Sequence, residues 1–273
     1  MLWRVCAWLL TAGIIAGGQA ARKQISLIVT NGTVVTLDAS RGTIPSGAVA
    51  IDGRDIVAVG TAEEIASKFT ATESVDATGS VVLPGLINTH THAPMVLYRG
   101  LADDLALMEW LQKYIFPAEA KTVTPEFVRI GTSLAVLEMI QSGTTTYVDM
   151  YYFEEEIARA TKAAGLRAVL GQTIMKFPVP DAKTAADGLA RASAFVSEFQ
   201  NDDLITPAYA PHAMYTLDAA MLKSIRAAAT RAKAPLIIHL AETRDEVRIA
   251  QKQHGTSPVQ YLESLGMWAA SPT

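Results

Sequence analysis

From Val81 onward, short apolar runs rich in β-branched residues alternate with longer alanine-rich amphipathic stretches. The runs, each of which predicts a strand, are residues 81–90, 144–150, 168–173, 205–209 and 236–240. The stretches, each of which predicts a helix, are residues 125–141, 154–164, 185–199 and 217–232. Gly143 and Gly165 stand where helix C-caps are expected. This alternation implies a parallel α/β sheet, either open or closed into a (β/α) barrel.

The number of strands limits how complete such a barrel can be. A closed barrel has eight strands and typically about 250 residues. Only five strands are identified here, and about 190 residues follow Val81. We therefore expect residues 83–273 to form an incomplete barrel and the chain to be truncated at its C-terminus.

Residues 24–82 depart from this pattern and predict a small all-β unit. Asn31-Gly32 and Asp52-Gly53 each lie between β-rich runs, a combination that favours hairpins. Residues 63–69 predict one short helix within this unit.

The first 20 residues predict a secretory signal peptide. One positive charge, Arg4, precedes an apolar run over residues 5–16, and small residues lead to Ala20, where we expect cleavage. The alternative is a membrane anchor, but the run is shorter than the roughly 20 residues that a spanning helix needs. We expect an exported protein, periplasmic or secreted, that meets a membrane only through an uncleaved signal segment.

Charge and cysteine content exclude several classes of function. The formal net charge is −4, and the chain has no basic stripe with interleaved aromatic residues, so nucleic acid is not an expected partner. Cys6 is the single cysteine, which excludes an intramolecular disulfide and a cysteine-based zinc site. The expected partner is a small-molecule substrate, and a homo-oligomer is left open.

Four of the five histidines follow or end predicted strands, where a parallel sheet places its active-site face. They are His90, His92, His212 and His239. His90 and His92 are two residues apart in an extended segment, so both imidazoles point to the same side and can share a metal ion. Three neutral imidazoles suit zinc, iron or a similar divalent ion with water in a fourth position. The alternative is strand-end histidines that hydrogen-bond to the backbone.

Glu242 comes three residues after His239, on the loop expected over the same mouth. A carboxylate there can accept a proton from metal-activated water and pass it to a leaving group. A solvated loop glutamate is the alternative.

Several motifs together carry a family resemblance that extends from about residue 25 to the end of the chain. They are LPGLINTHTHAPM at 83–95, YRGLADD at 98–104, GTTTYVDM at 143–150, APH at 210–212 and HLAET at 239–243. In order and spacing they resemble the amidohydrolase superfamily. The chain is most similar to the branch that deaminates 5′-methylthioadenosine and S-adenosylhomocysteine, which is related to cytosine deaminases and chlorotriazine hydrolases.

This resemblance implies a fold, a cofactor and roles for particular residues. The fold is a (β/α)8 TIM-type barrel with an N-terminal β-sandwich subdomain. The cofactor is one divalent ion, zinc or iron, bound by His90, His92 and His239. Glu242 matches the proton shuttle. The positions that match purine-site or ribose-site residues are His212, Trp110 and Glu119. The family completes its metal site with a further histidine and an aspartate from later strands, which this sequence does not reach.

One substrate-binding position differs from the family pattern. Members that act on S-adenosylhomocysteine carry an arginine after the third strand, which holds the substrate carboxylate, and the corresponding residue here is Gln172. Arginine suits a carboxylate because it donates two parallel hydrogen bonds. Its replacement favours an uncharged nucleoside, such as 5′-methylthioadenosine or adenosine.

Two other functions remain open at this point. One is an amidohydrolase that cleaves an amide or a carbon–chlorine bond at the same metal site. The other is a catalytically incomplete fragment or a binding protein that kept the pocket and lost catalysis.

Overall fold

The computed structural model describes residues 21–40 and 42–268, and divides the chain into two compact units between Pro84 and Gly85. Each unit is described by itself. The predicted signal peptide lies outside the described residues. No helix within the described ranges has the length and apolar composition needed to cross a membrane.

The first unit is built on a five-stranded sheet with the order β3-β2-β1-β4, and β5 pairs with β1. Its elements are β1 (Lys23–Val35), β2 (Thr43–Asp52), β3 (Asp55–Thr61), α1 (Ala62–Lys68), β4 (Phe69–Asp76) and β5 (Val81–Val82). Helix α1 matches the expected short helix and begins with a capping box formed by Thr61 and Glu64. The core of this unit is a small cluster of Ile25, Ala48, Ala50 and Ile65.

The two predicted hairpins of this unit have opposite outcomes. The Asp52-Gly53 hairpin is confirmed, since β2 and β3 pair antiparallel and Gly53 has a φ of +63°. The Asn31-Gly32 hairpin is wrong, because β1 continues through both residues. Strand β1 pairs with β2 on one side and with β4 and β5 on the other, which keeps it extended. Asn31, with a φ of 65°, therefore forms an irregularity in the strand instead of a turn.

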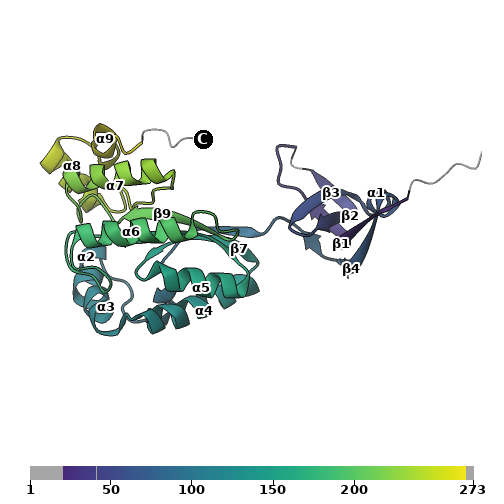
Figure 1. Ribbon diagram of the computed structural model, residues 1–273, viewed down its shortest axis with the longest axis horizontal. Helices are drawn as coiled ribbons and strands as arrows, with labels where there is room; N and C mark the ends of the chain where they lie inside the picture. The colour runs from purple at the N-terminus through teal and green to yellow at the C-terminus, as the bar shows by residue number, and fades with distance from the viewer. Residues whose placement is uncertain (1–20, 41, 269–273) are drawn as a thin grey trace, which may run out of the picture. The chain divides into compact units, whose positions relative to one another are not determined.

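The second unit contains a parallel sheet with the order β6-β7-β8-β9. Its strands are β6 (Leu86–Thr91), β7 (Thr144–Tyr151), β8 (Arg167–Ile174) and β9 (Ile205–Pro211). The main helices are α4 (Pro125–Gln141), α5 (Glu154–Ala164), α6 (Ala185–Phe199) and α7 (Ala219–Ala232). In Figure 1, α4 lies beside α5 and α6 beside α7, around these strands. This arrangement is the alternating α/β pattern that the sequence predicts.

Two predicted strands differ from the structure. The run 81–90 is divided, because β5 belongs to the first unit and β6 to the second, with Pro84 and Gly85 between them. The run 236–240 forms only two isolated parallel bridges, Tyr209 with Leu236 and Ala213 with His239, instead of a continuous strand.

The helix predictions are closer. Helices α4, α5 and α6 have the predicted limits, whereas α7 begins two residues later than predicted, after an Asp218 N-cap. The expected glycine C-caps are confirmed, since Gly143 follows α4 with a φ of 80° and Gly165 ends α5 with a φ of 76°. The chain continues beyond α7 through α8 (Arg244–His254) and α9 (Pro258–Ser264).

Between β6 and α4, the chain forms a helical segment that carries several candidate site residues. It consists of η1 (Ala93–Tyr98), α2 (Leu107–Trp110), the π-helical turn η2 (Leu111–Ile115) and α3 (Phe116–Thr122). Helix α4 packs closely on η1 at Gly131, where a Cβ would stand 2.6 Å from the carbonyl oxygen of Pro94. The absence of a side chain at Gly131 therefore allows this close approach directly after His92.

The core of the second unit lies between the sheet and its helices. One cluster includes Val128 of α4, Tyr147 of β7 and Ile157 of α5. A second cluster includes Leu222 and Ile225 of α7. These fully buried side chains hold the strands in register, and so fix the positions of the residues at their carboxyl ends.

Candidate functional site

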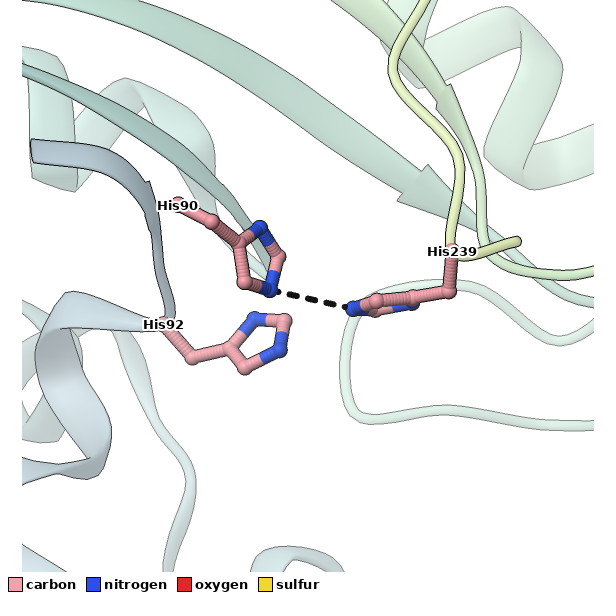
Figure 2. A group of neighbouring side chains, drawn as sticks. All are labelled: His90, His92 and His239. Atoms are coloured by element: carbon pink, nitrogen blue, oxygen red, sulfur yellow. Dashed lines mark hydrogen bonds between the residues drawn. The ribbon is translucent and has the colours of Figure 1, made fainter. Parts of the chain in front are cut away.

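The four predicted strand-end histidines come together in the second unit. His90 lies in β6, His92 directly follows that strand, His212 directly follows β9, and His239 lies on the segment bridged to Ala213. Figure 2 shows the imidazoles of His90, His92 and His239 pointing toward one another. Their candidate ligand nitrogens lie within 4.8 Å of one another.

Hydrogen bonds fix the direction of two of these rings. The Nδ1 atom of His92 lies 2.6 Å from the carbonyl oxygen of Met150, and that of His239 lies 3.0 Å from the carbonyl oxygen of His212. In each ring, Nδ1 carries the proton that it donates to the carbonyl, so Nε2 presents a lone pair. A hydrogen-bonded outer nitrogen is the usual arrangement for a metal-bound histidine.

The spacing of the nitrogens agrees with one tetrahedral ion. The Nε2 atoms of His90 and His239 are 3.3 Å apart. Two nitrogens that each bind zinc at about 2.0–2.1 Å, at a tetrahedral angle, are separated by about 3.3 Å. The three-imidazole donor set therefore fits zinc or a similar divalent ion.

The surroundings also keep these histidines neutral. Burial lowers the pKa of His92 to about 4, and lowers the pKa of His239. Burial and repulsion by His239 lower the pKa of His90. Neutral imidazoles are the form that binds metal.

His212 lies beside this group without joining it. Its ring is buried, its Nδ1 lies 3.3 Å from Thr216 Oγ1, and its ring centroid is 4.8 Å from that of His239. Burial lowers its pKa to about 3. His212 also lines the adjoining cavity. A neutral imidazole at this position can hydrogen-bond to a bound molecule.

Glu242 lies on the loop after His239. Its backbone N–H donates to Glu246 Oε2 at 2.8 Å, and Ala241 before it has a φ of 55°. Burial and the charge of Glu246 raise the pKa of Glu242, while His90 lowers it. Glu242 is thus held close enough to His90 for their charges to interact. The sequence reasoning missed Glu246, although the Thr243-x-x-Glu246 spacing at the start of α8 is a capping signal.

Trp110 and Glu119 both line a cavity of about 50 Å³ together with His92 and His212. Glu119 in α3 is 5% exposed, so it is not a surface residue. It accepts hydrogen bonds from the hydroxyls of Tyr151, at 2.8 Å, and Tyr152, at 3.4 Å.

Burial raises the pKa of Glu119 to about 7. The sequence reasoning missed its two tyrosine partners, whose signal was their place at the end of β7.

Gln172 lies outside this cavity. Its side chain is fully buried, and Nε2 donates to Asp181 Oδ2 at 2.9 Å. Asp181 Oδ2 also accepts from the backbone N–H of Phe153 at 2.8 Å and lies 3.3 Å from Arg191 Nε. The neighbouring Thr173 lines the cavity instead. The structure therefore places Gln172 in a network that holds the loop after β7.

Two larger cavities adjoin the narrow one. A cavity of about 780 Å³ shares His92 and Trp110 with it. A cavity of about 390 Å³ shares Phe116, Glu119 and Tyr152 with it. The remaining walls of this third cavity are Ala120, Phe177, Pro178, Val179 and Pro180. The site is therefore narrow at the histidines and widens on two sides.

Known sequences that are similar to this chain include two bacterial deaminases. The 5-methylthioadenosine/S-adenosylhomocysteine deaminase of Syntrophobacter fumaroxidans is 49% identical over 241 residues, which are 88% of this chain and 55% of that protein. The deaminase of the same name from Thermodesulfovibrio yellowstonii is 45% identical over 244 residues, which are 88% of this chain and 55% of that protein. The chain spans about half the length of these relatives.

Solved structures agree with the fold. An adenosine deaminase from Xanthomonas campestris with bound zinc is 37% identical, with a TM-score of 0.88 over 90% of this chain and 56% of that one. An atrazine chlorohydrolase from Arthrobacter aurescens is 19% identical, with a TM-score of 0.78 over 88% of this chain and 58% of that one. This second likeness concerns the fold alone. The predicted TIM-type α/β fold class is confirmed.

A family match covers the whole region in which the histidines lie. Residues 81–270 match the amidohydrolase family, and this stretch includes all eight residues singled out for metal, substrate or proton transfer. The chain therefore belongs to the amidohydrolase family.

Proposed function

We propose that the protein is a metal-dependent hydrolase that deaminates aminopurine nucleosides such as 5′-methylthioadenosine or adenosine. The observation that carries this proposal is the convergence of His90, His92 and His239 beside a cavity lined by Trp110 and Glu119. The deaminases to which the chain is similar, one of them with bound zinc, support the same reaction class. Because the chain spans about half of these relatives, the activity is proposed for the whole protein.

In this proposal, the residues of the chain divide the reaction between them. His90, His92 and His239 would hold the ion, which would act as a Lewis acid and lower the pKa of water. Glu242 accepts the proton of the attacking water and delivers it to the departing amine, which leaves as ammonia. His212, which is neutral and buried at the cavity wall, orients a ring nitrogen of the purine.

Two cavity features support a nucleoside with an uncharged 5′ end. Glu119 is a buried acceptor that can bind two ribose hydroxyls, as its bonds to two tyrosine hydroxyls show it can accept more than one donor. Beyond Glu119, the cavity of about 390 Å³ is lined mainly by apolar side chains, and none of its described lining residues is a cation. A carboxylate at the 5′ end would meet no opposite charge from these residues.

Export is a separate proposal. The N-terminal segment, residues 1–20, has the composition of a signal peptide. Detection of mature protein beginning near Ala21 in a periplasmic or secreted fraction is the expected result, and cytoplasmic full-length protein would contradict it.

The test of the activity is a substrate panel given to the zinc-loaded protein. We expect ammonia release from 5′-methylthioadenosine or adenosine, and less from S-adenosylhomocysteine. Release of amine or chloride from amides or chlorinated triazines, without ammonia from nucleosides, would favour the alternative hydrolases. Saturable nucleoside binding with no product would favour a binding protein.

A matched variant tests the proton shuttle. Glu242→Gln keeps the size of the side chain and removes the base, so we expect zinc content near that of the wild type and loss of turnover. Wild-type ammonia release by this variant would contradict the role of Glu242.

A further inference from the structure

Two carboxyl side chains are completely buried where β7 ends. Asp149 lies in β7 and Glu154 is the first residue of α5, and both are 0% exposed. Asp149 Oδ1 accepts a hydrogen bond from the backbone N–H of Ala93 at 2.5 Å. Glu154 Oε1 accepts one from the backbone N–H of Tyr151 at 2.7 Å. One oxygen of each carboxyl group is thus committed to a backbone donor.

The second oxygen of each group lacks such a donor. Among the described residues, neither Asp149 Oδ2 nor Glu154 Oε2 receives a hydrogen bond from an N–H or a hydroxyl. Burial raises the pKa of Asp149 to about 7, and burial and the charge of Asp149 raise that of Glu154 well above its usual value. The two carboxyl groups are close enough for the charge of one to act on the other. Two ionised groups here would repel each other, whereas one proton between them satisfies both oxygens.

Asp149 and Glu154 bind backbone groups on both sides of the hydrogen bond between His92 and the Met150 carbonyl oxygen. Ala93, which bonds to Asp149, directly follows His92 in the chain. Met150, whose carbonyl oxygen accepts from His92 Nδ1 at 2.6 Å, lies between Asp149 and Tyr151. The pair therefore fixes the position of Ala93 relative to the Met150 carbonyl, which orients the His92 ring.

We propose that Asp149 and Glu154 share one proton and act together as positioning residues that hold His92 in its metal-binding orientation. This inference rests on the proposed metal site. Neither residue would touch substrate or metal, and neither belongs to the roles assigned above. The readouts below are zinc affinity and the state of the shared proton, so they do not depend on whether nucleosides are deaminated.

Amide substitutions test the sharing of the proton. In Asp149→Asn, the amide oxygen can still accept from Ala93, and the amide nitrogen can donate to an ionised Glu154. In Glu154→Gln, the amide can accept from Tyr151 and donate to an ionised Asp149. Each single variant therefore replaces the shared proton by an amide donor. The double variant instead sets two amide nitrogens against each other.

Zinc affinity, measured by competition with a chelating dye, gives the expected pattern. We expect both single variants to bind zinc nearly as tightly as the wild type. We expect the double variant to bind zinc at least about tenfold more weakly, since loss of partners behind metal-bound histidines typically costs about 10–100-fold. A double variant that binds zinc as tightly as the singles would overturn the positioning role.

A control separates positioning from general stability. Tyr147 is buried in the same strand and its hydroxyl bonds to Thr161 Oγ1. Tyr147→Phe removes this buried hydrogen bond, so we expect a lower Tm and an unchanged zinc affinity. A loss of affinity in this variant equal to that of the double variant would show that the affinity follows stability alone, and would overturn the inference.

Infrared difference spectra test the proton directly, even where the double variant does not fold. The wild type minus either single variant should show the carbonyl band of one protonated carboxylic acid, because each amide leaves its partner ionised. The wild type minus Tyr147→Phe should lack this band. Absence of the band from both single-variant spectra would overturn the shared proton.

Discussion

At the contact between α4 and η1, replacing Gly131 changes the free energy of unfolding through two opposing effects, overpacking and helix propensity. Gly131→Ala adds a Cβ that would stand 2.6 Å from the carbonyl oxygen of Pro94 and 2.8 Å from its Cα. Overpacking of this kind typically costs about 1–3 kcal/mol, while alanine in place of glycine inside a helix contributes about 1 kcal/mol. Because both contacts are with backbone, we take the upper part of the first range. The expected net loss is about 1–2 kcal/mol.

Gly188 in α6 provides the matched control. A Cβ there would lie 3.3 Å from Cγ2 of Ile174 and 3.5 Å from its Cα, a much milder approach. Gly188→Ala should therefore gain up to about 1 kcal/mol of stability from helix propensity.

Urea unfolding followed by circular dichroism measures both variants against the wild type. The expected order of stability is Gly188→Ala above Gly131→Ala, with the wild type between them. Since Pro94 lies two residues after His92, we also expect weaker zinc binding in Gly131→Ala. A Gly131→Ala protein at least as stable as Gly188→Ala would refute the reasoning, because the close contact would then carry no cost.

Three further predictions concern the site. Lowering the pH through about 7 should raise the KM for a nucleoside, because the pKa of Glu119 is raised to about 7 and only its ionised form offers acceptors to both ribose hydroxyls. Glu119→Gln should flatten this pH profile of KM. An unchanged profile would contradict the role of Glu119 in binding the ribose. Gln172→Ala should lower the free energy of unfolding by about 1–3 kcal/mol, since Asp181 loses a buried donor. Its nucleoside affinity, measured by calorimetry, should not change, and a weaker affinity would place Gln172 at the substrate. Removal of zinc by a chelator should lower the Tm, since an ion at 100 times its Kd contributes about 2.7 kcal/mol to the folded state; an unchanged Tm would contradict the metal site.

The sequence predicts the helices of the second unit well because their signals are local. Helices α4 and α6 each begin at a threonine whose side chain caps the first turn, and α5 ends at a glycine. The Asn31-Gly32 pair carries an equally local turn signal, yet pairing on both sides of β1 overrides it. Pairing between distant strands does not appear in a local pattern, so this prediction failed.

In the candidate site too, local signals were predictable from the sequence, whereas long-range packing was not. The histidines were identifiable because each ends or follows a predicted strand, and parallel strands end at one edge of a sheet. The burial of Glu119 depends on how α3 packs against Tyr151 and Tyr152, which no spacing in the sequence reveals.

Gln172 illustrates a finer difficulty. Successive side chains in a strand face opposite ways, so a position one residue away from Thr173 faces the Asp181 network instead of the cavity.

The π-helical turn η2 determines how many residues can separate Trp110 from Glu119 when both face the same cavity. Trp110 and Glu119 are nine residues apart, which is about two and a half turns of a regular α-helix and would set them on opposite sides. They line the same cavity because the π-turn accommodates one additional residue. The helix beyond the turn is therefore oriented as if only eight residues separated Trp110 from Glu119, which is about two and a quarter turns. A homologue with one residue fewer between Leu111 and Ile115 should therefore present the same two side chains on an uninterrupted α-helix. Alignments of such homologues should place their single-residue gap within these five positions.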